Sequence, residues 1–115
     1  MTDRAESTTM ASESEAREVE DRLQHDLDLG HHLEVIPDLI SAVEDQPLRQ
    51  RRWALLMLAL YRAGRQIEAL RTFERLRSLL ENDYGLPPSF ELEELERAIL
   101  LQRAELDWTS PGAPN

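Results

Sequence analysis

The chain is short and acidic: its 115 residues carry 23 acidic side chains, 13 basic ones and a formal net charge of −10 at pH 7. This charge argues against general affinity for DNA or for an anionic membrane, because both contacts need Lys and Arg. The length allows one domain at most.

Cysteine is absent, which excludes a disulfide framework and thiolate chemistry and suits the cytosol. The first dozen residues lack the basic start and apolar core of a signal peptide. The longest apolar run, residues 53–61, is shorter than a membrane span, which takes about 20 residues. We therefore expect a cytoplasmic protein that makes no membrane contact.

Charge is unevenly distributed along the chain. Residues 1–48 hold 3 Arg against 13 acids, a net −10, whereas residues 49–77 hold 8 Arg against 2 acids, a net +6. Residues 78–115 hold 2 Arg against 8 acids, a net −6. Either the basic middle pairs internally with the acidic ends, or it forms an Arg-rich face for an acidic partner.

The first predicted helix follows a polar stretch. Residues 1–12 are rich in Ser, Thr and Glu without periodicity, and we expect a disordered tail there. Ser12 and Glu15 match a capping box, so the helix should start near Ser12 or Ser14 and end at Gly30. Its apolar residues fall on one helical stripe, which consists of Ala16, Val19, Leu23 and Leu27.

Two more helices are predicted over residues 32–45 and 48–63. The former should bury one face, made of Ile36, Leu39, Ile40 and Val43. Pro37 conflicts with it, so this helix either starts late, near Pro37, or is kinked there. The helix over 48–63 contains the run WALLMLALY, which is apolar on all sides. We expect other helices to enclose it, because an edge helix shows a one-sided stripe instead.

The last two helices are predicted over residues 66–84 and from Ser89 onward. Gly85 ends the former, and Pro87-Pro88 marks a rigid connection. Ser89 is a good N-cap, with acidic residues following in the first turns. The inward face of the last helix should consist of Leu92, Leu95, Ile99 and Leu106. Residues 108–115 are expected to be a second disordered tail.

An internal repeat links these helices. The segment starting at Gly30 aligns with the one starting at Gly64, an offset of 34 residues, which is the period of tetratricopeptide repeats. Pro47 lies at the repeat-closing position. Packing residues recur at the expected spacings, at Trp53, Leu56, Ala69 and Phe73. The pattern predicts an all-α, tetratricopeptide-like α-solenoid of two helix-turn-helix repeats and a C-terminal capping helix, five helices in all.

With these residues in view, the chain resembles the bacterial transcriptional activator domain of the Streptomyces antibiotic regulatory protein family. The resemblance is carried by PLRQRRWALLMLALYRAGRQ at residues 47–66 and by YGLPPS at residues 84–89. It implies a repeat domain over residues 13–107 that serves dimerisation and contacts with the transcription machinery.

In that family a winged-helix DNA-binding domain precedes the repeats, whereas this chain begins with a short polar stretch. We therefore expect either a piece of a longer protein or a shortened relative, and no direct nucleic-acid binding.

Catalytic and metal chemistry lack support in the sequence. His25, His31, His32 and Glu34 lie close together, but adjacent histidines point in different directions and no ligand set has metal spacing. No phosphate-binding loop or nucleophile elbow is present. We expect no enzyme activity, no cofactor and no metal.

Binding of a protein partner is better motivated. If the repeat register holds, the concave face is lined by the first helix of each pair, which places together Arg17, Glu20, Gln24, Arg51, Ala54, Leu58 and Arg62. Because two repeats are few for a stable array, we also expect an exposed apolar strip on the first helix, covered by a homodimer or a partner.

Two functions remain open. The chain is either a regulatory module that contacts the transcription machinery or a DNA-binding regulator, or a small adaptor that binds a partner enzyme, for example in a biosynthetic pathway.

Overall fold

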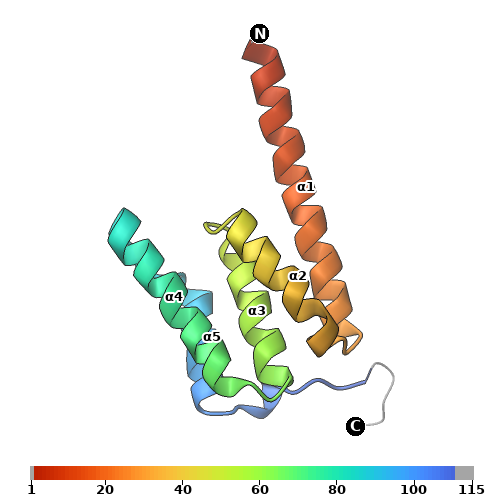
Figure 1. Ribbon diagram of the computed structural model, residues 1–115, viewed down its shortest axis with the longest axis vertical. Helices are drawn as coiled ribbons and strands as arrows, with labels where there is room; N and C mark the ends of the chain where they lie inside the picture. The colour runs from red at the N-terminus through yellow and green to blue at the C-terminus, as the bar shows by residue number, and fades with distance from the viewer. Residues whose placement is uncertain (1, 111–115) are drawn as a thin grey trace.

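The computed structural model describes the backbone of residues 2–110 and the side chains of residues 13–110. It contains five helices: α1 (Thr2–Asp28), α2 (His32–Asp45), α3 (Gln50–Arg62), α4 (Gln66–Tyr84) and α5 (Phe90–Leu100) (Figure 1). A 3₁₀ turn, Ala104–Leu106, follows α5. Residues 2–110 contain no β-strand. The predicted all-α fold of two helix pairs and a fifth helix is confirmed.

Helix α3 lies at the centre, in contact with α1, α2, α4 and α5. Seven of its residues are buried, including Trp53 and the segment 55–57, and Ala54, Leu58 and Tyr61 are half-buried against the same core. The expectation of an enclosed helix is confirmed, except along the stripe that contains Ala54 and Leu58. An apolar surface on all sides is what such a central position requires, because each side meets another helix.

The two pairs are closed by the same turn, 34 residues apart. Gly30 and Gly64 have φ angles of 88° and 81°, in the left-handed region that favours glycine. The amides of Gly30 and His31 bond to the carbonyls of Leu27 and Asp26, the hydrogen-bond pattern of a Schellman motif. Gly64 makes the corresponding bond to Tyr61. The recurrence of this motif supports the predicted repeat.

Helix α1 differs from the expectation at its start and on its surface. It begins at Thr2, not near Ser12, because residues 2–29 contain neither Gly nor Pro to interrupt it. Residue 1 lies outside the described residues. Between residues 13 and 28 the apolar residues Ala16, Leu23 and Leu27 are buried and Val19 is half-buried. The expected exposed apolar strip on this helix is therefore wrong, since α2 and α3 already cover it.

Helix α2 continues through Pro37. It starts at His32, and the Val35 amide bonds to the His31 carbonyl at 3.1 Å, so the late start at Pro37 is wrong. Proline lacks only its own N–H, which would have reached the Leu33 carbonyl. The buried face also differs from the expected one: Ile40 is exposed, and Val35 and Ala42 are buried in its place.

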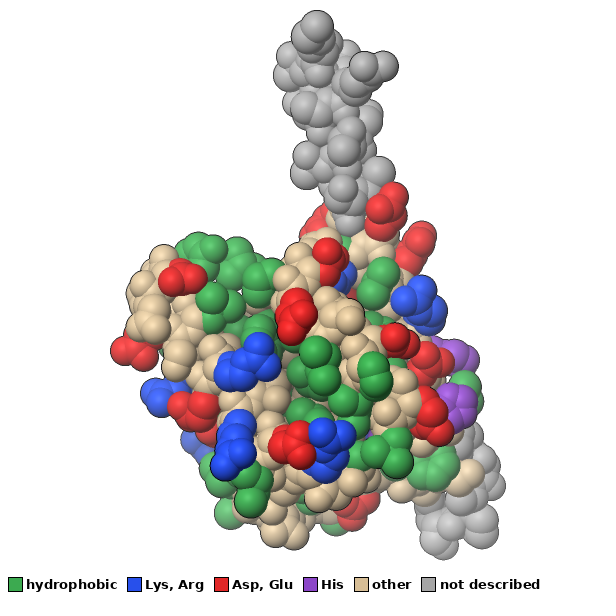
Figure 2. Space-filling model, in the orientation of Figure 1, with side chains coloured by type: hydrophobic (Ala, Val, Ile, Leu, Met, Phe, Trp, Pro, Cys, Tyr) green, Lys and Arg blue, Asp and Glu red, His purple; other side chains and the backbone are tan. Residues whose placement is uncertain are grey.

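Charged side chains are sorted by helix on the surface. Helix α2 carries acidic residues and no Arg, whereas α4 carries three Arg along its length. In the view of Figure 2, acidic side chains predominate over α1 and α2, and the arginines lie mainly over α4. No helix within residues 2–110 is long and apolar enough to cross a membrane.

Helix α5 begins at the N-cap that the sequence predicts. The Ser89 hydroxyl accepts a hydrogen bond from the Leu92 amide at 3.3 Å, and the Ser89 amide donates to Gln50 Oε1 at 2.8 Å. We expect Ser89→Ala to lower the free energy of unfolding by about 1 kcal/mol. Urea unfolding followed by circular dichroism measures the change, with exposed Ser78→Ala in α4 as the control. Equal effects of the two substitutions would contradict the assigned cap.

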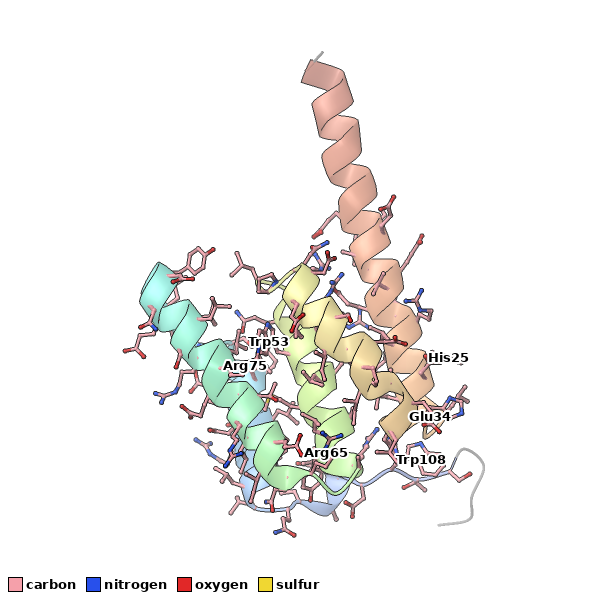
Figure 3. All side chains as sticks on the ribbon, in the orientation of Figure 1. His25, Glu34, Trp53, Arg65, Arg75 and Trp108 are labelled. Carbon is pink, nitrogen blue, oxygen red and sulfur yellow. The ribbon has the colours of Figure 1, made fainter. Side chains whose placement is uncertain are left out.

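The segment after α5 folds back onto α1 and α2. Leu106 is buried as predicted, although it lies in the 3₁₀ turn and not in α5. The Trp108 indole donates a hydrogen bond from Nε1 to the Asp28 carbonyl at 3.0 Å, at the junction of α1 and α2 (Figure 3). The expected tail over residues 108–115 is thus wrong for Trp108, because its ring finds both an acceptor and a flat glycine surface. Residues 111–115 lie outside the described part.

Substituting Gly30 tests this contact. A Cβ at Gly30 would lie 2.7 Å from Trp108 Cζ2, whereas a Cβ at Gly64 would meet nothing within 4 Å. Both positions have positive φ, so both Ala variants carry the backbone strain, and Gly30→Ala alone adds the clash. We expect Gly30→Ala to be more destabilising than Gly64→Ala by about 1–3 kcal/mol, with a red-shifted Trp108 emission. Equal unfolding free energies for the two variants would show that Trp108 does not pack there.

Candidate interaction surface

The face shared by α1 and α3 holds most of the predicted partner-binding residues. On α3, Arg51 is exposed and Ala54 and Leu58 are half-buried, which marks the least buried stripe of that helix. On α1, Arg17 is exposed and Gln24 is half-buried. The structure therefore places these five residues on the surfaces of adjacent helices, as the repeat register predicts.

A surface ion pair joins the two helices on this face. Asp21 lies between Arg17 and Gln24 on the same side of α1, and its Oδ1 atom is 2.8 Å from Arg51 Nη1. The Gln24 amide in turn donates to Asp28 Oδ1 at 3.1 Å. The face is polar along α1 and becomes apolar only at Ala54 and Leu58.

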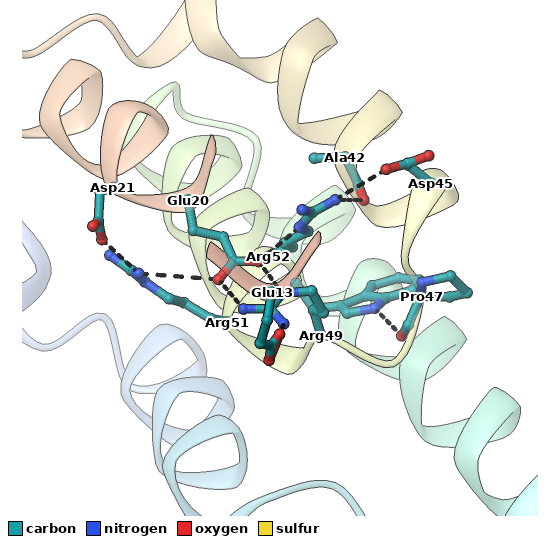
Figure 4. Close-up of polar contacts among 10 residues, drawn as sticks. Glu13, Glu20, Asp21, Ala42, Asp45, Pro47, Arg49, Arg51 and Arg52 are labelled. Atoms are coloured by element: carbon teal, nitrogen blue, oxygen red, sulfur yellow. Dashed lines mark hydrogen bonds and ion pairs between the residues drawn. The ribbon is translucent and has the colours of Figure 1, made fainter. Parts of the chain in front are cut away.

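Glu20 does not belong to this face. Its side chain is 1% exposed, enclosed between α1 and the start of α3 (Figure 4). Arg52, which is 2% exposed, donates from Nε to Glu20 Oε2 at 2.8 Å and from Nη1 to the Ala42 carbonyl at 2.8 Å. The prediction that Glu20 contacts a partner is therefore corrected: the carboxylate is consumed by contacts inside the protein.

Arg49 completes the buried cluster. Its Nε and Nη2 atoms donate to the two oxygens of Glu20, the latter at 2.9 Å, in a forked arrangement. Its Nη1 atom reaches outward to Glu13, 2.7 Å away. We call Glu20, Arg49 and Arg52 the Glu20 cluster. It joins α1 and α3 and, through the Ala42 carbonyl, α2.

The Glu20 cluster resolves an electrostatic conflict at the start of α3. The N-terminal end of a helix carries partial positive charge, yet α3 has Arg at its first positions and no acidic residue in its first turn. Glu20 supplies the missing negative charge from α1. Burial on its own would raise the pKa of Glu20, but the hydrogen bonds and charges of Arg49 and Arg52 outweigh it and lower that pKa.

These contacts decide between the two interpretations of the charge distribution for the start of α3. Arg49, Arg51 and Arg52 all pair with acids of α1, or of α2 in the case of Asp45. Farther along, Arg65 pairs with Glu68, and Arg77 pairs with Glu74. The basic middle section is thus largely paired inside the chain.

Arg62 lies under the returning C-terminal segment. Its Nε atom donates to the Leu106 carbonyl at 2.8 Å, and burial lowers the pKa of its guanidinium. A cavity of about 490 Å³ next to it is also lined by Tyr61, Gln66 and Trp108. The prediction placed Arg62 in an open groove with Leu58, whereas residues 104–108 partly cover it.

The histidines are divided between surface and interior. His31 is exposed, whereas His32 packs edge-on against Trp108, with ring centroids 5.7 Å apart at 76°. Burial lowers the pKa of His32, and its Nδ1 atom has no hydrogen-bond partner among the described residues. No group of three or more His, Asp or Glu in the described part of the chain is arranged to hold a metal ion.

Sequence reasoning missed the Glu20 cluster and the role of Trp108. Three Arg at one helix start, with no acid in that first turn, were the available signal for the cluster, because such a start needs an anion from elsewhere. A Trp in an otherwise polar terminal segment was the signal for the second, because a large aromatic ring is seldom left in water.

Comparison with known proteins gives consistent matches. The family model described as bacterial transcriptional activator domain matches residues 2–100. The regulatory protein DnrI of Streptomyces peucetius is 37% identical over 102 residues, which are 89% of this chain and 38% of DnrI. The regulatory protein AfsR of Streptomyces griseus is 45% identical over 87 residues, 76% of this chain and 9% of AfsR.

A solved structure agrees in fold. Mycobacterium tuberculosis EmbR, in complex with a low-affinity phosphopeptide, aligns with a TM-score of 0.76 and 26% identity. The alignment covers 83% of this chain and 25% of the EmbR chain. In all three comparisons the chain spans well under half of the relative.

Proposed function

Because the chain belongs to the bacterial transcriptional activator domain family, we propose that it is a protein-interaction module of bacterial transcriptional control. Its relatives are transcriptional regulators. In our proposal it acts in the cytoplasm, through a component of the transcription machinery or a DNA-binding regulator, and makes no contact with DNA itself.

The observation that carries the proposal is the extent of the match. The segment shared with DnrI and AfsR covers most of this chain, yet it is 38% of DnrI and 9% of AfsR. Regulators that differ so much in length thus have this one domain in common. A domain shared in this way contributes one transferable property, and for a helical repeat without catalytic groups that property is binding of a protein.

We assign the contact to the α1–α3 face, defined by Arg17, Gln24, Arg51, Ala54 and Leu58. Adjacent helices hold these residues in fixed relative positions, since the Glu20 cluster lies directly beneath them. The two arginines flank an apolar centre, which suits a partner with acidic residues around an apolar side chain. The net charge of −10 supports the absence of DNA contact.

Affinity capture from the native host tests the proposal. The tagged chain is compared with Arg17→Ala/Arg51→Ala and with a charge-matched control, Arg71→Ala/Arg97→Ala, whose residues are exposed on α4 and α5. We expect RNA polymerase, a sigma factor or a DNA-binding regulator to be recovered with the wild type and the control, and to be lost with the first variant. Recovery of a biosynthetic enzyme instead would establish the adaptor function.

A gel shift tests the part of the proposal that concerns DNA. The purified chain should leave labelled promoter DNA unshifted at physiological salt. A shift that specific competitor DNA removes would contradict the proposal.

A further inference from the structure

A second surface, separate from the α1–α3 face, lies between α4 and α5. It is a groove of about 730 Å³. Its apolar lining comes from Phe73, which is 3% exposed, and from Leu86, Pro87 and Pro88 in the connection between the two helices. No described residue before α4 or after α5 lines it, because the segment after α5 runs back toward α1 and Gly30.

The repeat register explains why an apolar groove lies there. Helix α5 contacts α3 and α4 as α3 contacts α1 and α2, so α5 takes the place of the first helix of a third pair. The groove positions Phe73 and Arg77 correspond, 34 residues earlier, to Leu39 and Val43, which are buried at 0% and 1% exposure. The groove therefore consists of the positions with which one helix pair receives the next.

The internal repeat also shows what kind of helix such a surface receives. At the equivalent junction, Arg75 and Leu79 of α4 lie against Val43, Glu44 and Trp53, in a cleft lined by all five residues. The Arg75 guanidinium is 5.5 Å from the centroid of the Trp53 ring. A helix that carries Arg and Leu four residues apart is thus already accommodated once in this molecule.

Charge distinguishes the α4–α5 groove from that junction. Carboxylates line both walls, Glu74 and Glu81 from α4 and Glu93 and Glu96 from α5. The one cation among the lining residues, Arg77, is already bound to Glu74 at 2.7 Å. Burial raises the pKa of Glu96, and the neighbouring charges of Glu74 and Glu93 raise it further. The groove therefore carries negative charge that its own residues do not neutralise.

We propose that the α4–α5 groove binds an amphipathic helix of a partner protein, whose Arg or Lys side chains pair with Glu93 and Glu96 while an apolar side chain covers Phe73. The claim rests on the proposed function only in taking the partner to be a protein. It names the chemistry of a second contact, independent of the α1–α3 face.

Fluorescence anisotropy with a synthetic peptide tests the groove. The probe is a 15-residue helix-forming peptide, Arg and Leu four residues apart on one face; its control has the same composition scrambled, so that no such face exists. The protein variants are Glu93→Gln/Glu96→Gln in the groove and Glu91→Gln/Glu94→Gln, which make the same charge change on α5 outside it. We expect about tenfold weaker binding for the groove variant and no change for the control variant.

Folding of the groove variant is checked independently. Because ionised Glu96 is disfavoured in the folded state, Glu93→Gln/Glu96→Gln should melt no lower than the wild type, so lost binding is not lost folding. Equal binding of the ordered and scrambled peptides, or equal weakening by the two double variants, would overturn the groove and show only attraction to an acidic protein.

Two further outcomes separate this inference from the proposed function. A host partner that is lost with Arg17→Ala/Arg51→Ala but retained with Glu93→Gln/Glu96→Gln, in a protein that does not bind the peptide, leaves the proposed function standing and refutes the groove. A dimer in sedimentation that Glu93→Gln/Glu96→Gln dissociates would identify a second copy of this chain as the occupant, which also overturns the inference.

Discussion

Replacing Glu20 by Gln is expected to lower the free energy of unfolding by about 3–5 kcal/mol. The substitution keeps the shape of the side chain but leaves Arg52, at 2% exposure, without the carboxylate that accepts from its Nε atom. Arg49 loses its inner partner at the same time. An unpaired buried cation costs far more than an exposed ion pair contributes, because the protein interior solvates charge poorly.

Urea unfolding measures the effect, with Asp21→Asn as the matched control. Asp21 is exposed and pairs with Arg51 at 2.8 Å on the surface, so its loss should cost less than about 1 kcal/mol. A double variant, Glu20→Gln/Arg52→Met, should recover part of the stability, because it removes the unpaired charge as well. If Glu20→Gln and Asp21→Asn prove equally mild, the Glu20 cluster does not hold α1 to α3.

The Glu20 cluster also predicts acid sensitivity. The pKa of Glu20 is lower in the folded state than its ordinary value of 4.5, so the folded protein binds its proton less readily than the unfolded chain. The stabilisation is therefore fully present above pH 4.5 and is lost as the pH falls through the folded-state pKa. The wild type should lose more stability than Glu20→Gln over that acidic range.

Replacing Trp53 by Ala is expected to cost about 3–5 kcal/mol. The ring is 3% exposed at the junction of α2, α3 and α4, and its Nε1 atom donates to the Pro47 carbonyl at 2.8 Å. Trp53→Phe should be milder, because it keeps much of the apolar volume and loses the hydrogen bond and part of the stacking surface under Arg75 (Figure 3).

Trp108 provides the control for Trp53. It is 36% exposed and also makes one hydrogen bond to a backbone carbonyl, so Trp108→Ala should cost clearly less than Trp53→Ala. Thermal unfolding monitored at 222 nm, a wavelength at which helices absorb, compares the variants on one scale. A larger loss for Trp108→Ala would mean that the repeat junction is not the principal core.

The helices could be predicted because their signals are local. The bounds of α4 match the expected 66–84, and Ser89 caps α5 as predicted, since periodicity, glycine and N-cap residues act within a few positions. The start of α1 could not be placed in the same way: Ser12 and Glu15 have capping-box spacing, yet the same spacing also fits inside a continuous helix.

The site was predicted less completely because its contacts are long-range. Repeat register placed Arg51, Ala54 and Leu58 on one face, but the same register placed Glu20 there too. The turn of α1 that decides its burial is fixed by Arg49 and Arg52, 29 and 32 positions away. Helical periodicity cannot weigh such pairings, since it treats a charged residue as a surface residue.

The most direct test of the proposed regulatory role is transcript profiling in the native host. The chromosomal copy is changed to Arg17→Ala/Arg51→Ala, with Arg71→Ala/Arg97→Ala as the control, and protein levels are matched. We predict that the first variant alters a defined set of transcripts in the same direction as a deletion and that the control does not. Unchanged transcripts in both the first variant and the deletion would contradict a role in transcriptional control.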